Sequence, residues 1–208
     1  MCALEILCLV LVSCQSVLGQ SDTNLVAIGD WSTPVADSDG YTLRGRLLVA
    51  RPLPPTTVGR NRARFVPNAR VYLELEHPFT RAWYPPIEIY FDPVKDLRFS
   101  MHDALDQPIP SEPVAIRGPV PPRSWVTVPC DATLKLRADL RMGTTNGRED
   151  ALTIGTLGGH WTIRPGTTNE YLLSGRFTAT TNQPSAFLYH RWHGTLDLPK
   201  LKIPKAWR

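Results

Sequence analysis

The sequence predicts an all-β protein, an antiparallel β-sandwich that follows an N-terminal signal segment. Polar and apolar residues alternate with a period of two along several segments, which is typical of strands that bury one face. The 208 residues include 20 Pro, which is excluded from helix interiors and central strands. No apolar stripe recurs at helical spacing. Together these observations predict many short strands separated by turns.

Residues 1–19 are predicted to be a targeting segment that is not part of the fold. The continuous apolar run over residues 6–12 fits the hydrophobic region of a secretory signal peptide. It falls far short of the roughly 20 residues that span a bilayer, so we expect no transmembrane segment. Cleavage after Gly19 follows the small-residue rule. Residues 20–208 then form a single β-sandwich domain.

A second processing route stays open, because Leu11-Val12-Ser13-Cys14 resembles the box that precedes a lipid-anchored cysteine. This route would tether the chain to the envelope by a lipid anchor on Cys14. We favour cleavage after Gly19, since the apolar run, a polar spacer and the cut then follow in the usual order. The expected product is an exported protein, secreted or periplasmic. The first five residues contain no Lys or Arg, which departs from the pattern of both routes equally.

Seven segments show the alternation and are expected to be strands. In residues 133–142, for example, Leu134, Leu136, Ala138 and Leu140 alternate with charged residues. In chain order the segments are 41–51, 69–77, 96–103, 124–129, 133–142, 170–180 and 194–203.

The last of these segments changes parity halfway along. Leu196 and Leu198 share one face, whereas Leu201 and Ile203 fall on the other. A β-bulge at Pro199–Lys200 would return all four side chains to the core, and Pro is tolerated at bulges. We therefore predict an irregular ladder at this position.

Three stretches carry a resemblance to a known class of domain: "GPVPPRSWVTVP", "EYLLSGRFTAT" and "RWHGTLDLPKLKIP". Over residues 118–204 the chain loosely resembles Ig-like β-sandwich domains of secreted bacterial proteins of unassigned function. The resemblance implies that Trp192 is buried between the sheets. It implies nothing about activity, because these motifs concern strand packing.

Aromatic residues concentrate in a predicted loop, "HPFTRAWYPP", which contains Phe79, Trp83 and Tyr84. Flat aromatic rings in a loop can stack on sugars or contact a protein. The competing interpretation is that they cap one end of the sandwich.

Arginines recur in "GRNRAR", where Arg60, Arg62 and Arg64 would share one face if the segment is extended. Such a row can clamp an anionic polymer. A solvated loop is the competing interpretation, because the net charge of +4 is modest and no aromatic residues interleave. We expect no nucleic-acid partner.

Three further patterns are expected to carry no chemistry. His190 and His193 lie three apart and point to opposite faces of a strand, so a metal site with His160 is not expected. Residues 37–40, "DSDG", fit a turn better than a calcium loop. Cys130 has no base identifiable from the sequence.

The sequence also lacks a nucleophile elbow, a Gly-rich phosphate loop and a paired-His zinc helix. We therefore expect no cofactor, and a catalytic role ranks third among the function classes, because no acid/base pair can be named from residue spacing alone. The expected function is a non-catalytic exported interaction or structural module, which contacts a protein or polysaccharide of the cell envelope. The alternative is a carbohydrate-binding accessory protein that uses the aromatic loop.

Overall fold

The computed structural model describes the greater part of the chain beyond residue 24. Its described residues contain strands and no helix, and none of them forms a helix long and apolar enough to cross a membrane. The described ranges are 25–50, 69–78, 85–113, 123–130, 132–144, 152–156, 158–164, 170–179 and 189–203.

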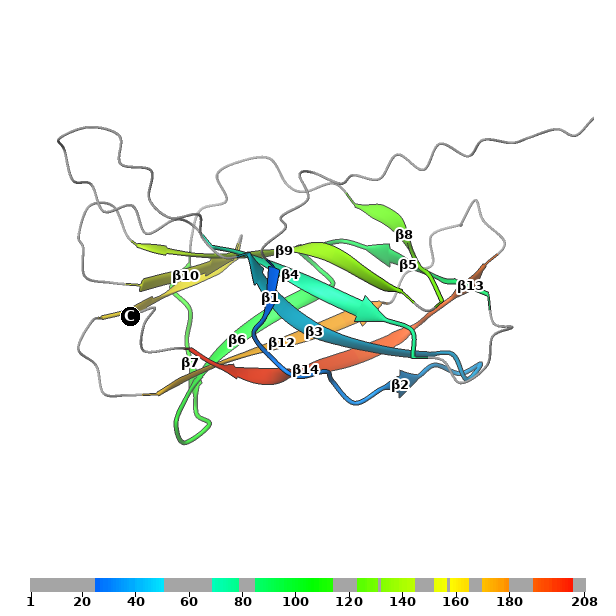
Figure 1. Cartoon of the computed structure of the whole chain (residues 1–208). Coiled ribbons are helices and arrows are strands. Elements are labelled where there is room, and N and C mark those ends of the chain that lie inside the picture. Colours follow the sequence, from blue (N-terminus) through cyan, green and yellow to red (C-terminus); the bar gives the residue numbers. More distant parts are fainter. Residues whose placement is uncertain are drawn as a thin grey trace, which may run out of the picture.

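The strands are numbered in chain order and drawn in Figure 1. They are β1 (Leu25–Ala27), β2 (Val35–Ala36), β3 (Thr42–Ala50), β4 (Ala69–Glu76), β5 (Ile87–Phe91), β6 (Leu97–Asp103), β7 (Pro108–Ile109), β8 (Ser124–Val128), β9 (Thr133–Thr144), β10 (Leu152–Thr156), β11 (Gly159–Ile163), β12 (Tyr171–Ala179), β13 (His190–Arg191) and β14 (Gly194–Lys202).

The largest sheet has the order β1-β3-β4-β9-β10-β11, with β2 paired to β3. Every neighbouring pair in it is antiparallel. Across its centre, Leu47 pairs with Leu73, which pairs with Leu136, and all three are buried. One residue away Arg46 pairs with Glu74. One face of this sheet is therefore apolar and the other carries charged pairs, as the alternation predicts.

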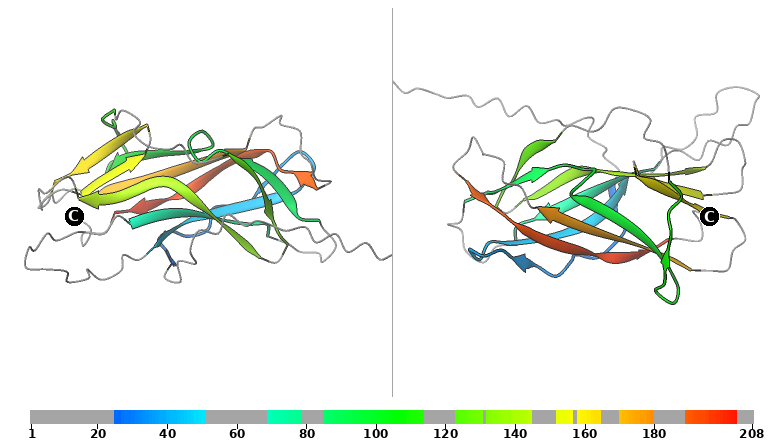
Figure 2. Two further views of the ribbon diagram at one scale, coloured as in Figure 1. Left: turned by 90° about the horizontal axis from the view of Figure 1, so that it is seen from above. Right: turned by 180° about the vertical axis from the view of Figure 1, so that it is seen from behind.

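A four-stranded sheet, β14-β12-β6-β7, packs against the apolar face of the largest sheet, as the two views of Figure 2 show. The two sheets approach closely: a Cβ atom added at Gly45 of β3 would lie 3.1 Å from Leu198 of β14. A third sheet, β13-β5-β8, contains the parallel pair β13–β5. The architecture is all-β, predominantly antiparallel and sandwich-like.

The core is one cluster of buried apolar side chains that come from all three sheets. The Trp192 ring is 1 % exposed and stacks on Phe177 with 6.3 Å between ring centroids. Its Nε1 donates a hydrogen bond of 3.1 Å to the Tyr41 carbonyl oxygen. The predicted burial of Trp192 is confirmed.

The predicted bulge in the last strand is also confirmed. Leu173 pairs with Leu201 and Gly175 pairs with Leu198, so Pro199–Lys200 together oppose one residue of β12. The shift buries the apolar residues on both sides of it, namely Leu196, Leu198, Leu201 and Ile203.

Candidate functional site

The residues that the sequence suggested for ligand binding or lipidation lie outside the described part of the chain. They are Arg60, Arg62, Arg64, Phe79, Trp83, Tyr84 and Cys14. The signal segment and its two processing routes lie there too.

The structure does describe where the aromatic segment 79–84 joins the fold. The Pro78 carbonyl oxygen accepts a hydrogen bond of 3.3 Å from Thr42 Oγ1 on β3. On the other side, Ile87 begins β5 and pairs with His190 of β13. The residues on both sides of segment 79–84 are therefore attached at the end of the sandwich that carries His190.

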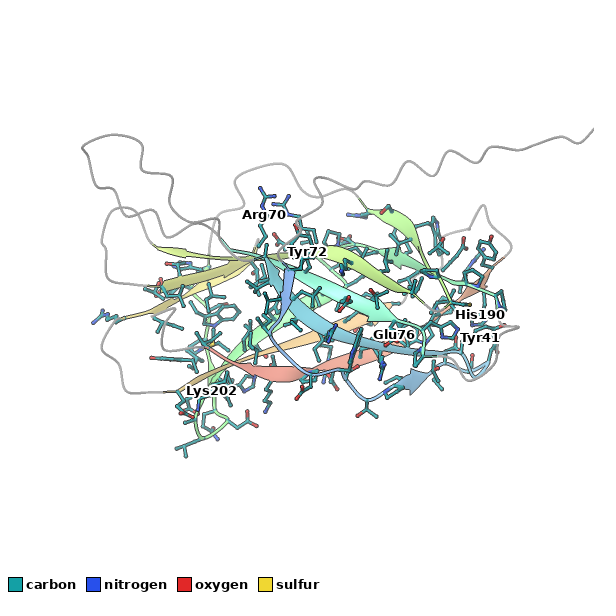
Figure 3. The ribbon with its side chains drawn as sticks, viewed as in Figure 1. Tyr41, Arg70, Tyr72, Glu76, His190 and Lys202 are labelled. Atoms are coloured by element: carbon teal, nitrogen blue, oxygen red, sulfur yellow. The ribbon has the colours of Figure 1, made fainter. Side chains whose placement is uncertain are left out.

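His190 is fixed at this end by a buried carboxylate. Its Nε2 lies 2.6 Å from Oδ2 of Asp37, whose side chain is 2 % exposed. Its Nδ1 lies 3.6 Å from Asp39. The imidazole stacks on the Tyr41 ring with 3.7 Å between centroids. Figure 3 shows these two side chains next to each other at this end of the sandwich. Because both ring nitrogens face carboxylates, this histidine holds the N-terminal turn against β13.

The turn itself agrees with the interpretation of "DSDG" as a turn. Asp37 Oδ1 accepts hydrogen bonds from the backbone N–H groups of Asp39 and Tyr41, at 3.1 and 2.9 Å. Gly40 has φ of 86°, in the left-handed region that glycine adopts without strain. Asp37 therefore shapes the turn and anchors His190 at once.

Two of the three histidines considered for a metal site face different carboxylates. His160 Nε2 lies 3.1 Å from Glu112 Oε2, while His190 pairs with Asp37. His193 is exposed. Among the described residues, no group of three or more His, Cys, Asp or Glu side chains could hold a metal ion.

Cys130 is half-buried just after the end of β8. Its backbone forms an isolated parallel bridge with His77, a neighbour that the sequence did not reveal. The Nδ1 atom of the His77 ring lies 2.6 Å from the Thr42 carbonyl oxygen. Burial lowers the pKa of His77 below 6.5, and the Thr42 carbonyl opposes this shift.

Charged residues on the outer face of the largest sheet form a cross-strand network. Arg44 pairs with Glu76 and Arg46 with Glu74, each at 2.6 Å. Both guanidinium groups lie over the Trp31 ring, 4.8 and 4.4 Å from its centroid. These contacts link the segment before β2 to β3 and β4, which is a structural role.

A small pocket lies between β7 and β11 and holds about 100 Å³. Its wall combines apolar side chains with the His160–Glu112 pair. Pockets for small-molecule ligands typically hold about 300–1,000 Å³. This pocket is therefore too small for a drug-sized ligand.

The clearest chemical constellation lies on the outer face of the four-stranded sheet. Ser100 of β6 pairs directly with Ser174 of β12, which brings their Oγ atoms to 2.7 Å. His102 lies two residues along β6 and therefore on the same face. Its Nε2 is 3.0 Å from Ser100 Oγ and 3.3 Å from Ser174 Oγ.

The other nitrogen of His102 faces Asp106 in the hairpin between β6 and β7. His102 Nδ1 lies 3.2 Å from Asp106 Oδ1 and 3.3 Å from the Asp106 carbonyl oxygen. Lys200, at the bulge of β14, pairs with the same carboxylate. Its hydrogen bond lowers the pKa of Asp106 below the ordinary value, so the carboxylate stays ionised at neutral pH.

These contacts define the hydroxyl–imidazole–carboxylate cluster: Ser100, Ser174, His102, Asp106 and Lys200. An ionised Asp106 beside Nδ1 favours the tautomer with the proton on Nδ1, which leaves Nε2 as the acceptor toward Ser100. Sites with a serine nucleophile have the same arrangement, in which a hydroxyl contacts Nε2 of a histidine and a carboxylate contacts Nδ1.

No family model, curated protein or solved structure matches the chain.

Proposed function

We propose that the chain is an exported interaction or structural module of the cell envelope, built as an Ig-like β-sandwich. The observation that carries the proposal is the braced end of the sandwich, which consists of Asp37, Tyr41, His190 and the two joins of segment 79–84. A loop held on a rigid scaffold is the usual way in which β-sandwiches present a binding surface.

The brace is stiff because its contacts are buried and come from distant parts of the chain. Asp37 Oδ2 and His190 Nε2 lie 2.6 Å apart, although the two residues are 153 apart in sequence. Trp192 anchors to the Tyr41 carbonyl oxygen directly beside it. A partner that binds segment 79–84 therefore meets a loop whose two ends are already fixed, which lowers the entropy cost of binding.

A second candidate is carbohydrate binding by the aromatic residues Phe79, Trp83 and Tyr84. One described feature favours it: Tyr189, next to His190 at the same end, is a large aromatic residue that is 44 % exposed. Exposed aromatic rings stack on the apolar faces of sugars. Under this candidate the partner is an envelope polysaccharide instead of a protein.

Crosslinked pull-down of the purified chain from the envelope fraction of its own host tests the proposal. We expect a reproducible partner that is lost when Trp83 and Tyr84 are both changed to Ala and retained in the control Thr195→Ala. Thr195 is exposed at the beginning of β14 and belongs neither to segment 79–84 nor to the residues of the brace. Equal capture by wild type and the double variant would contradict the proposal.

Co-sedimentation with isolated envelope polysaccharide separates the two candidates. A protein module stays in the supernatant, whereas a carbohydrate-binding protein sediments with the polymer. The double variant of Trp83 and Tyr84 must abolish sedimentation for the second candidate to hold. Sedimentation that Thr195→Ala also abolishes would count as non-specific and against the carbohydrate candidate.

A further inference from the structure

We propose that Ser100 is the nucleophile of an ester-hydrolysing site formed by the hydroxyl–imidazole–carboxylate cluster. In this site His102 acts as general base, Asp106 orients the imidazole and Ser174 positions the Ser100 hydroxyl. The inference goes beyond the proposed function, and it departs from the expectation that the chain is non-catalytic.

The distances within the cluster satisfy the requirement for an activated hydroxyl. A nucleophile and its base need to lie within about 2.6–3.2 Å, and Ser100 Oγ is 3.0 Å from His102 Nε2. With Nε2 as acceptor, Ser100 donates its proton there, and Ser174 donates to Ser100 Oγ at 2.7 Å. Ser100 is the nearer of the two hydroxyls to the base and the more exposed.

The cluster is held by several elements and does not depend on one mobile side chain. Asp106 has φ of 64° and occupies the left-handed position of a tight hairpin, where a residue other than glycine is uncommon. Asp103 Oδ1 fixes this hairpin by accepting hydrogen bonds from the N–H groups of Leu105 and Gln107. The bulge in β14 supplies Lys200 to the Asp106 carboxylate. Strained positions of this kind cluster at functional sites.

The same face offers a cation for the oxyanion that forms during ester cleavage. Arg98 lies two residues before Ser100 and pairs across the sheet with Arg176. Arg176 is engaged by Asp197 at 2.6 Å, whereas Arg98 forms no ion pair with any described residue. Its guanidinium can therefore turn toward a developing negative charge.

The shape of the face sets the substrate class. Ser100 lies on an open sheet surface among exposed polar residues, so no described wall would hold a long acyl chain. The substrate is therefore a carboxylic ester of a short acyl group. Backbone N–H groups of a strand lie in the plane of the sheet and do not project from the face that carries Ser100, so they form no second oxyanion donor. We accordingly expect slow turnover.

The reaction conserves atoms and protons. Ser100 Oγ attacks the ester carbonyl, a new Oγ–acyl bond forms and the bond to the leaving oxygen breaks. The Ser100 proton passes to His102 Nε2 and then to the leaving oxygen, which departs as an alcohol. Water then gives a proton to Nε2 and its oxygen to the acyl carbon, releasing a carboxylic acid and restoring the Ser100 hydroxyl.

Labelling with a fluorophosphonate probe tests the nucleophile directly, because Ser100 Oγ would displace fluoride from phosphorus. We expect a covalent adduct that fragmentation mass spectrometry assigns to Ser100. Ser100→Ala should abolish the adduct, and His102→Gln should slow labelling by about 100-fold or more, the range of a lost general base. Asp106→Asn keeps the turn and should slow labelling less than His102→Gln.

Two control variants separate this site from background reactivity. Thr178 and Thr195 form a hydroxyl pair on the same sheet at 3.3 Å, without an imidazole at hydrogen-bonding distance among the described contacts. Thr195→Ala should therefore leave labelling and hydrolysis of 4-nitrophenyl acetate unchanged. His193→Gln removes an exposed histidine and should do the same.

An adduct on another residue, or equal labelling rates of wild type and His102→Gln, would overturn the proposal. So would hydrolysis of 4-nitrophenyl acetate that Ser100→Ala leaves intact. Circular dichroism of each variant confirms that the fold is kept, as expected for substitutions on an outer face. If His102→Gln fails this check, His102→Asn provides the same test.

Discussion

Replacement of Trp192 by Ala removes the largest fully buried side chain among the described residues. The ring is 1 % exposed, stacks on Phe177 and donates its Nε1 hydrogen to the Tyr41 carbonyl oxygen. The substitution therefore opens a cavity between the sheets and leaves a carbonyl without this donor. It also removes a hydrogen bond that joins the region around Tyr41 to the core.

The expected cost follows from these two losses. Trp→Ala substitutions in cores destabilise by about 3–5 kcal/mol, and a lost hydrogen bond contributes roughly 1 kcal/mol. We expect a loss of about 4–6 kcal/mol, which is a large fraction of the roughly 5–15 kcal/mol that stabilises a typical protein. At about 2–4 °C per kcal/mol for a chain of this size, Tm should fall by roughly 8–24 °C.

Thermal unfolding followed by circular dichroism measures the effect, with Trp125→Ala as the matched control. Trp125 lies half-buried on β8 and contacts Tyr90 and Arg191 through its ring. Its removal should cost less than half as much. A Tm for Trp192→Ala equal to that of wild type, or higher than that of Trp125→Ala, would refute the packing described here.

Three further predictions concern particular positions. Gly194→Ala should destabilise by about 1–3 kcal/mol, because its new Cβ would lie 2.7 Å from the Trp192 ring, whereas Gly155→Ala meets its nearest atom at 3.6 Å and should change Tm little. Deletion of Lys200 removes the bulge and turns the following apolar residues outward, so the chain should fail to fold cooperatively. As the control, Lys200→Ala should change the free energy of unfolding by no more than about 0.5 kcal/mol. Because burial lowers the pKa of His77, the unfolded chain binds a proton near pH 6.5 that the folded chain does not. The urea concentration at the unfolding midpoint should therefore fall as the pH drops below about 6.5. His77→Gln should make this midpoint less dependent on pH.

Alternation of polar and apolar residues in the sequence predicts the strands that have one solvent-exposed face. In β9 the buried residues Leu136, Ala138 and Leu140 follow the period of two. β5 was not predicted, because Ile87, Glu88 and Ile89 are all buried and the pattern disappears when both faces are covered. The bulge in β14 was predictable because its apolar residues change parity at a Pro.

The hydroxyl–imidazole–carboxylate cluster was only partly visible in the sequence. Ser100 and His102 stand two apart on the polar face of an expected strand, and Asp106 follows four residues later. Ser174 comes from 74 residues away, and only the register of β6 and β12 places it beside Ser100. Cross-strand register is set by the whole sheet, so residue spacing alone does not reveal it.

The same limit applies to the braced end of the sandwich. The Asp37 turn was predictable from its composition, and its pairing with His190 was not, because 153 residues separate them. His190 was considered as a metal ligand because the sequence gives the residue type but not the side chains that the residue contacts. The structure shows a carboxylate on each side of the ring instead.

Export is the claim on which the proposed function depends, and the intact mass of the chain recovered from the cells that make it tests export directly. We predict a mature protein that begins at Gln20 and is found outside the cytoplasm. A chain that keeps residues 1–19 and stays in the cytoplasm would contradict the account. A chain that begins at Cys14 with the added mass of a diacylglycerol group would replace the soluble exported form with a lipid-anchored one.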